Sequence, residues 1–157
     1  MLSRFPILIL GLALSALAGA AAARDYIVVA STDPAIPRGA SYDAGARALL
    51  APGRTLTLMH ASGDMVRLKG APGGVAVPTR KAGQAEAERL AVLRTIVAPP
   101  ERTKAGLYAA RARAGVCPEA AGITTLDAIV QVHQGGCTDE AAQALESWMA
   151  SHPATDG

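Results

Sequence analysis

Aromatic side chains are scarce in this sequence of 157 residues, in which phenylalanine, tyrosine and tryptophan together make up 3%. Beyond residue 23, the only such rings belong to Tyr26, Tyr42, Tyr108 and Trp148. Proteins that bind single-stranded nucleic acid stack its bases on aromatic side chains, and carbohydrate-binding faces commonly present exposed rings. The scarcity therefore argues against both functions, and we expect no nucleic-acid partner.

Catalytic and metal-binding motifs are missing as well. The three histidines, His60, His133 and His152, show neither H-x-x-x-H nor H-E-x-x-H spacing, so we predict no metal site. The sequence contains no G-x-S-x-G or S-x-x-K motif of serine enzymes. The glycine-rich stretch 70–74 lacks the Lys-Ser/Thr pair of a phosphate-binding loop, so we interpret it as a turn and expect no cofactor.

Positive charge is absent from the end of the chain. None of the 15 lysines and arginines lies beyond Arg113, whereas six of the 13 aspartates and glutamates do. The two parts of the chain therefore carry opposite charge. They could dock on each other, present different faces to partners, or form ordinary solvated surfaces.

The first 23 residues have the layout of a secretory signal peptide. Arg4 supplies a positive start, residues 5–17 form an apolar run, and Ala21-Ala22-Ala23 offers small residues at a cleavage position. An uncleaved anchor is the alternative, because residues 5–23 carry no charge, but their Ala/Gly-rich second half is barely long enough to span a bilayer. We expect cleavage, a periplasmic or secreted protein, and no membrane span after cleavage.

Only two cysteines are present, Cys117 and Cys137, and both fall in the part expected to be exported. An oxidising compartment would join them in a disulfide. A redox pair is more typically Cys-x-x-Cys, and a metal site would need more ligands than His133 nearby. We therefore predict a structural disulfide, which closes a loop worth about 3 kcal/mol in the chain-entropy model.

Residues 51–74 contain the clearest secondary-structure signal, a β-hairpin. Leu56 and Leu58 alternate with polar residues on the first strand, and Val66 and Leu68 do so on the second. Between them, Ala61-Ser62-Gly63-Asp64 supplies turn chemistry. The alternation predicts a sheet with one dry face and one wet face, with Met65, Arg67 and Lys69 on the wet one.

This glycine-bounded run, T-L-T-L followed by S-G-D-M-V-R-L-K-G, resembles the short β-repeats of FecR-like envelope domains. The resemblance covers only the hairpin, residues 51–74. It implies a periplasmic β-domain used for interaction and not for catalysis. It carries over no functional residue.

The hairpin belongs to a predicted β-domain over residues 24–79. The β-branched run 26–30 predicts a buried strand, residues 31–42 a loop, and residues 46–50 and 75–77 two further short strands. Four or five such strands are enough for a small antiparallel sandwich or an open barrel.

A helix follows over residues 80–98, with its core face formed by Leu90, Leu93, Ile96 and Val97 and with Glu86, Arg89 and Arg94 able to face outward. Residues 99–116 form a basic connector, compatible with a short helix or a flexible segment. Its cations are our candidate contact surface for an envelope protein or an anionic envelope component: Arg102, Lys104, Arg111 and Arg113.

The last third, residues 117–151, predicts a helical hairpin clipped by the disulfide. We expect Thr124 to cap the first helix, glycines 135–136 to end it, and Thr138 to cap the second. The expected core stripe of the second helix is Ala142, Leu145 and Met149, widened by Trp148. Such short helices need partners, so they should pack on the sheet or on helix 80–98.

His60, Ser62 and Asp64 lie within five residues and contain the residue types of a hydrolytic triad. Triad members normally converge from separate parts of a scaffold, so we interpret this cluster as the polar tip of the hairpin. His133 falls on the apolar stripe of its helix, where a half-buried histidine is the default.

The fold expected from these features is α+β, a small antiparallel β-domain followed by the disulfide-clipped helical hairpin. The function that we favour is a non-catalytic bacterial envelope protein that binds or scaffolds another envelope component. The alternative is a small periplasmic hydrolase or transferase with its site at His60 and Asp64. The sequence identifies neither a substrate nor a partner.

Overall fold

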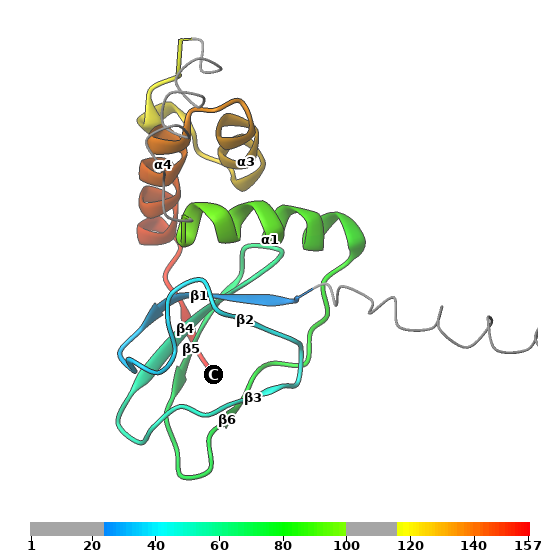
Figure 1. The fold of residues 1–157 in the computed structure, drawn as a ribbon, viewed down its shortest axis with the longest axis vertical. Coiled ribbons are helices and arrows are strands. Elements are labelled where there is room, and N and C mark those ends of the chain that lie inside the picture. The colour runs from blue at the N-terminus through cyan, green and yellow to red at the C-terminus, as the bar shows by residue number, and fades with distance from the viewer. Residues whose placement is uncertain (1–23, 100–115) are drawn as a thin grey trace, which may run out of the picture.

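The computed structural model describes residues 24–99 and 116–157, and it confirms the α+β class. One open sheet has the order β2-β1-β4-β5-β7, and a second pairs β3 with β6. The strands are β1 (Tyr26–Ser31), β2 (Ser41–Tyr42), β3 (Arg47–Ala48), β4 (Thr55–His60), β5 (Met65–Lys69), β6 (Val75–Ala76) and β7 (Thr155–Asp156). The helices are α1 (Gln84–Val97), the 3-10 turn η1 (Ala120–Gly122), α3 (Leu126–Gln134) and α4 (Thr138–Ser151). Figure 1 labels most of them.

The predicted hairpin is present as β4 and β5. Leu56 pairs with Leu68 and Met59 with Met65, and Gly63 in the turn has a φ of 105°. The expectation of a wet face is wrong for the turn end of the hairpin. Met59 and Met65 are both buried there, because the helices cover that part of the face.

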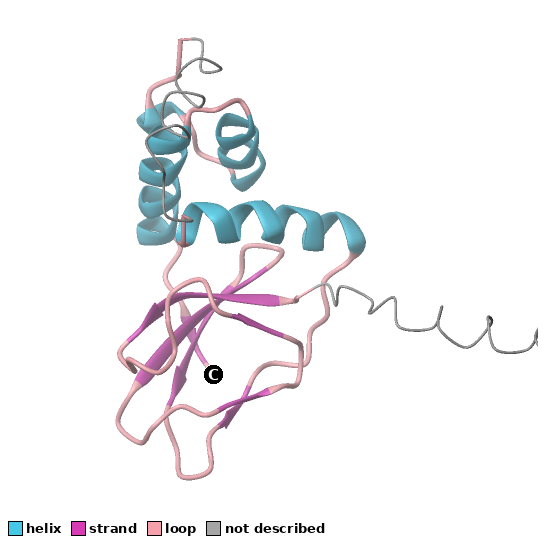
Figure 2. Ribbon diagram, viewed as in Figure 1, coloured by secondary structure: helices cyan, strands magenta, loops and turns pink. Residues whose placement is uncertain are grey.

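β1 is buried on both faces, as its β-branched run predicts. Ile27 and Val29 belong to the cluster shared with the helices, and Tyr26 and Val28 belong to a second cluster on the opposite face. That second cluster joins the leucines of the hairpin to Ala48, Leu50 and Val77 around the β3–β6 pair. The five-stranded sheet is thus the middle layer between the helices and the smaller sheet (Figure 2).

Two strands were not predicted. β2 lies at the end of the stretch expected to be a loop, where Ser41 pairs with Ile27. β7 follows α4 and pairs in parallel with β5 through Thr155 and Val66. Both are two residues long, and such short edge strands are determined by a neighbouring strand more than by their own sequence pattern.

α1 buries the four residues expected for its core face, Leu90, Leu93, Ile96 and Val97. Arg89 does not face outward as predicted. Its Nε pairs with Asp127 at 2.8 Å, so its side chain joins α1 to α3 and is only 25% exposed.

The Cys117–Cys137 disulfide is confirmed, and it encloses α3 between the segment before η1 and the start of α4. The predicted caps are each shifted by one residue. Thr125, not Thr124, accepts the hydrogen bond of Ala128 N–H at the start of α3. Cys137 occupies the position before α4, so Thr138 is already helical.

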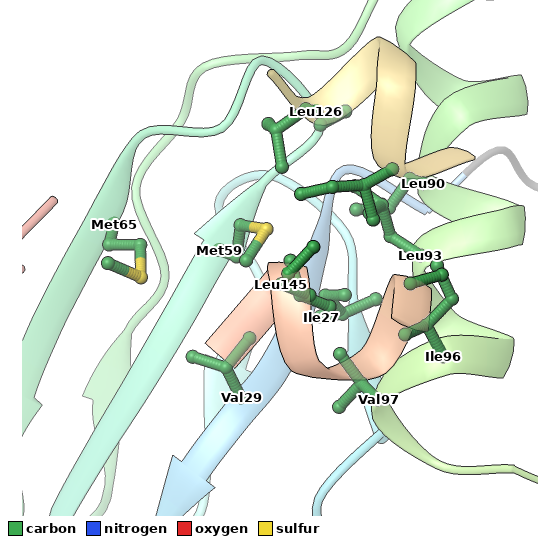
Figure 3. Close-up of a cluster of buried hydrophobic side chains, with 14 of the residues drawn as sticks. Ile27, Val29, Met59, Met65, Leu90, Leu93, Ile96, Val97, Leu126 and Leu145 are labelled. Atoms are coloured by element: carbon green, nitrogen blue, oxygen red, sulfur yellow. The ribbon is translucent and has the colours of Figure 1, made fainter. Parts of the chain in front are cut away.

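The core stripe of α4 also differs from the prediction. Ala141, Ala144 and Leu145 are the buried residues, while Trp148 and Met149 are partly buried against them. Leu145 and Leu126 meet Leu90 and Leu93 of α1 above Ile27 and Met59 of the sheet (Figure 3). The helices therefore pack on both the sheet and α1, as expected. Among the described helices, none is long and apolar enough to cross a membrane.

Candidate functional site

The cluster at the hairpin tip is a linear chain of polar contacts. His60 Nδ1 lies 2.8 Å from Ser62 Oγ and accepts the Ser62 backbone N–H at 3.0 Å. Ser62 Oγ in turn donates to Asp64 Oδ2 at 2.8 Å, and Arg80 pairs with the same carboxylate. The structure thus brings together the three residues singled out in the sequence and adds Arg80.

The order of this chain does not suit nucleophilic catalysis. In a hydrolytic triad the histidine lies between the serine and the acid, so that it can take the serine proton. Here Ser62 lies in the middle, and its hydroxyl donates its hydrogen bond to Asp64 and not to His60. His60 is 1% exposed, and its Nε2 has no hydrogen-bond partner within residues 24–99 and 116–157. Its ring packs edge-on to Tyr26, with the ring centroids 4.9 Å apart. The cluster fixes the turn.

Burial, hydrogen bonding and charge shift the pKa values of His60 and Asp64 in this cluster. Desolvation, helped by Arg80, lowers the pKa of His60 and keeps the ring neutral. The Ser62 hydroxyl is the largest cause that lowers the pKa of Asp64, and Arg80 acts in the same direction. At neutral pH the cluster at the hairpin tip therefore consists of a neutral imidazole, a hydroxyl, a carboxylate and a guanidinium, in that order.

The other two histidines lie elsewhere in the fold. His133 is half-buried on α3, and His152 stacks on Trp148 with ring centroids 4.1 Å apart. One group of possible metal ligands exists among the described residues, formed by Cys117, Cys137 and Glu140 with ligand atoms within 4.8 Å of one another. The two sulfurs form the disulfide, so they offer no thiolate to a metal.

A groove lies between α1 and the β1–β2 edge of the sheet, and its volume is about 540 Å³. We call this feature the α1 groove. Small-molecule sites typically have volumes of roughly 300–1,000 Å³. The lining comes from both walls and from the start of α1: Arg24, Ile27, Ser41, Ala82, Gly83, Gln84, Ala87, Glu88, Leu90, Ala91 and Arg94.

The hollow results from small side chains on one stripe of α1. Ala87 and Ala91 lie one turn apart beside the buried leucine face, and they stand opposite Ile27. Larger residues at these positions would fill the space against the sheet edge. Together with Leu90 they give the groove an apolar floor.

Polar groups line the α1 groove at few points. Arg24 pairs with Asp43 at 2.9 Å, whereas Arg94 donates from Nε to the carbonyl of Gly39 at 3.1 Å. The Ser41 hydroxyl oxygen is buried and has no hydrogen-bond partner among the described residues. An apolar floor with a few directed donors is the usual composition of a ligand site.

Both ends of the groove are fixed to the sheet. Near the start of α1, Asp25 accepts the N–H groups of Ala44 and Ala82 at 2.8 and 2.6 Å. At the other end, Gly39 with a φ of 83° lies so close to Ala98 that an added Cβ would be 2.3 Å from its methyl carbon. The two walls therefore keep a defined separation.

Sequence reasoning did not identify the α1 groove. The alanines flanking the leucine stripe of helix 80–98 were the available signal, but their position against the sheet edge depends on packing. The predicted contact residues Arg102, Lys104, Arg111 and Arg113 lie outside the described residues, as does the predicted signal peptide. Comparison with models of protein families, with curated proteins and with solved structures finds no match to this chain.

Proposed function

We propose that this protein is an exported, non-catalytic module of the bacterial envelope that binds another envelope component in the α1 groove. The observation that carries the proposal is the groove itself, an apolar hollow of about 540 Å³ with arginine donors at its walls. The hydrogen bond of Asp25 to Ala82 and the close approach of Gly39 to Ala98 fix the distance between its walls. A pre-formed hollow requires little ordering on binding.

Two features support export. The first 23 residues have the layout of a cleavable signal peptide. Cys117 and Cys137 form a disulfide, which persists in oxidising compartments and is rare in the cytosol. The proposed address is therefore the periplasm or the medium.

The geometry at the hairpin tip favours binding over catalysis. The hydrolase or transferase alternative would need His60 to activate a nucleophile, but its Nε2 is buried and its Nδ1 is occupied by Ser62. The α1 groove contains none of His60, Asp64 and His133. The resemblance of the hairpin to FecR-like interaction domains implies the same kind of role.

Site-specific photo-crosslinking in whole cells tests the proposal. A photoreactive residue would replace Gln84, an exposed residue that lines the groove, or, as the matched control, Ala85, an exposed alanine of α1 that does not line it. We expect a discrete adduct from position 84 and none from position 85 when the exported protein is analysed by intact mass spectrometry. Equal labelling of both positions, or no adduct at position 84, would exclude the groove as a binding site.

We also propose that the basic residues Arg102, Lys104, Arg111 and Arg113 contact an anionic part of the same envelope component or its surroundings. Their clustering on one segment of the sequence supports this. Replacing all four by glutamine should reduce the adduct yield at position 84 without moving it to another position. An unchanged yield would show that these charges do not contribute.

A further inference from the structure

We infer that the α1 groove binds a single-chain anionic amphiphile, with its head at Arg94 and its apolar chain along Ala91 and Ala87. This inference rests on the proposed function and adds the chemical class of the ligand. The shared chemistry of the head is a carboxylate or phosphate group carrying negative charge and acceptor oxygens only.

The head position follows from the two arginines. Arg24 already faces the carboxylate of Asp43 at 2.9 Å, so its charge is largely compensated. Among the described residues, Arg94 donates to the neutral Gly39 carbonyl and makes no ion pair with a carboxylate. A guanidinium presents a planar fork that fits carboxylate or phosphate oxygens. Arg94 is therefore the better site for an anion.

The position of the ligand's apolar chain follows from the residues that line the floor of the groove. From Arg94 back to Gly83 the groove runs along eleven residues of α1, or about 16 Å. This path is lined by Ile27, Leu90 and the two alanines, and its length and the groove volume of about 540 Å³ fit one apolar chain that lies along α1. Glu88 is the acidic residue of the lining, and it is exposed. It disfavours a second anionic head midway along the groove.

The test is binding of twelve-carbon probes to the exported, oxidised protein, measured by isothermal titration calorimetry below micelle-forming concentrations. Dodecanoate and dodecyl phosphate distinguish a fatty-acid head from a phosphate head. Dodecanol and dodecyltrimethylammonium provide the uncharged and cationic comparisons. We expect at least one of the two anions to bind at least tenfold more tightly than both comparison probes.

Variants of the groove residues test where the head and the apolar chain of the ligand bind. Arg94→Gln should weaken binding of the anion about tenfold, and Arg94→Lys should restore part of it. Arg54→Gln is the matched control, because Arg54 also donates to a backbone carbonyl, that of Thr32, and does not line the groove; it should change the affinity less than threefold. Ala91→Trp should abolish binding while Ala85→Trp leaves it unchanged. Thermal unfolding of each variant checks that it folds, and Ala91→Leu replaces Ala91→Trp if the larger ring prevents folding.

The outcomes separate this inference from the proposed function. If dodecanol binds as tightly as the anions, or if Arg94→Gln has no effect, the anionic head is excluded, although loss of binding in Ala91→Trp still supports a groove ligand. If position 84 crosslinks to a polypeptide and none of the probes binds, the amphiphile is excluded and the groove remains a binding site. If Ala91→Trp binds every probe like the wild type and position 84 forms no adduct, both proposals fail.

Discussion

The carboxylate of Asp25 accepts a 2.6 Å hydrogen bond from the backbone N–H of Ala82, a residue 57 positions further along the chain. Its other oxygen accepts the N–H of Ala44 at 2.8 Å. One buried side chain thus connects the first strand, the segment after β2 and the start of α1. These are the elements that frame the α1 groove near its Arg24 end.

Replacing Asp25 by asparagine should therefore destabilise the protein by about 2 kcal/mol, because one of the two backbone N–H groups would face an amide NH₂ in place of a charged acceptor. Chemical denaturation measures this loss. Asp43→Asn is the matched control, since Asp43 makes an exposed pair with Arg24 and should contribute less than about 1 kcal/mol. Equal losses in both variants would contradict a special role for Asp25.

Gly63 combines two constraints at the hairpin turn. Its φ is 105°, and an added Cβ would lie 2.6 Å from Leu126 Cδ1 and 3.1 Å from Trp148 Cη2. Gly63→Ala should destabilise the protein by roughly 2–4 kcal/mol, the sum of left-handed strain and overpacking. Gly53→Ala introduces the left-handed strain alone, because the φ of Gly53 is 77° and no atom lies within 4 Å of an added Cβ. It should lower the free energy of unfolding by about 1–2 kcal/mol. Urea unfolding of both variants gives the difference due to packing.

His60 should make the protein less stable as the pH falls. Its folded pKa is lowered, chiefly by burial, below the ordinary value of 6.5. Above pH 6.5 the ring is neutral in both states and contributes no pH dependence. Below 6.5 the unfolded chain binds the proton first, so the free energy of unfolding decreases until the pH reaches the folded pKa.

Unfolding measurements between pH 7.5 and 4.5 check this dependence. The window lies above the range in which Asp33 and Asp64 titrate, since their pKa values are lowered from 3.8 by hydrogen bonds to backbone N–H groups and to Ser62 respectively. His60→Asn keeps an acceptor for the Ser62 N–H and should reduce the slope. His152→Gln should retain it. A slope that disappears only in His152→Gln would show that His60 is not responsible.

The disulfide should stabilise the helical hairpin. It joins residues 20 positions apart around α3, and in the chain-entropy model its removal costs about 3 kcal/mol. Mild reduction should lower the midpoint of thermal unfolding, and the double variant Cys117→Ser/Cys137→Ser should show the same lowering without reductant. An equal reductant effect on the double variant would indicate another cause.

The regular elements were predictable because their residues repeat at the period of a strand or a helix. Leu56, Leu58 and Leu68 follow the period of two, and Leu90, Leu93 and Val97 follow that of a helix, so these side chains are buried as expected. The cap of α3 was misplaced by one residue because Thr124 and Thr125 are chemically equivalent caps. Only the path of the backbone selects between them.

The residues of the polar cluster at the hairpin tip could be predicted from the sequence, but the order of the contacts between them could not. His60, Ser62 and Asp64 are close in sequence and therefore close in space. That Ser62 lies between the other two depends on the turn conformation, which buries His60 beneath Tyr26. Arg80 reaches Asp64 from sixteen positions away, and no local pattern marks that contact.

The sequence alone determined the α+β class, the positions of the main strand pair and helices, and the pairing of the only two cysteines, because each depends on local periodicity or on simple counting. Tertiary packing decided the two-sided burial of the sheet, the return of β7 to β5 and the existence of the α1 groove. Ala87 and Ala91 are ordinary helix-forming residues in the sequence. They enclose a hollow only because α1 lies beside Ile27 and Ser41 at the edge of the sheet.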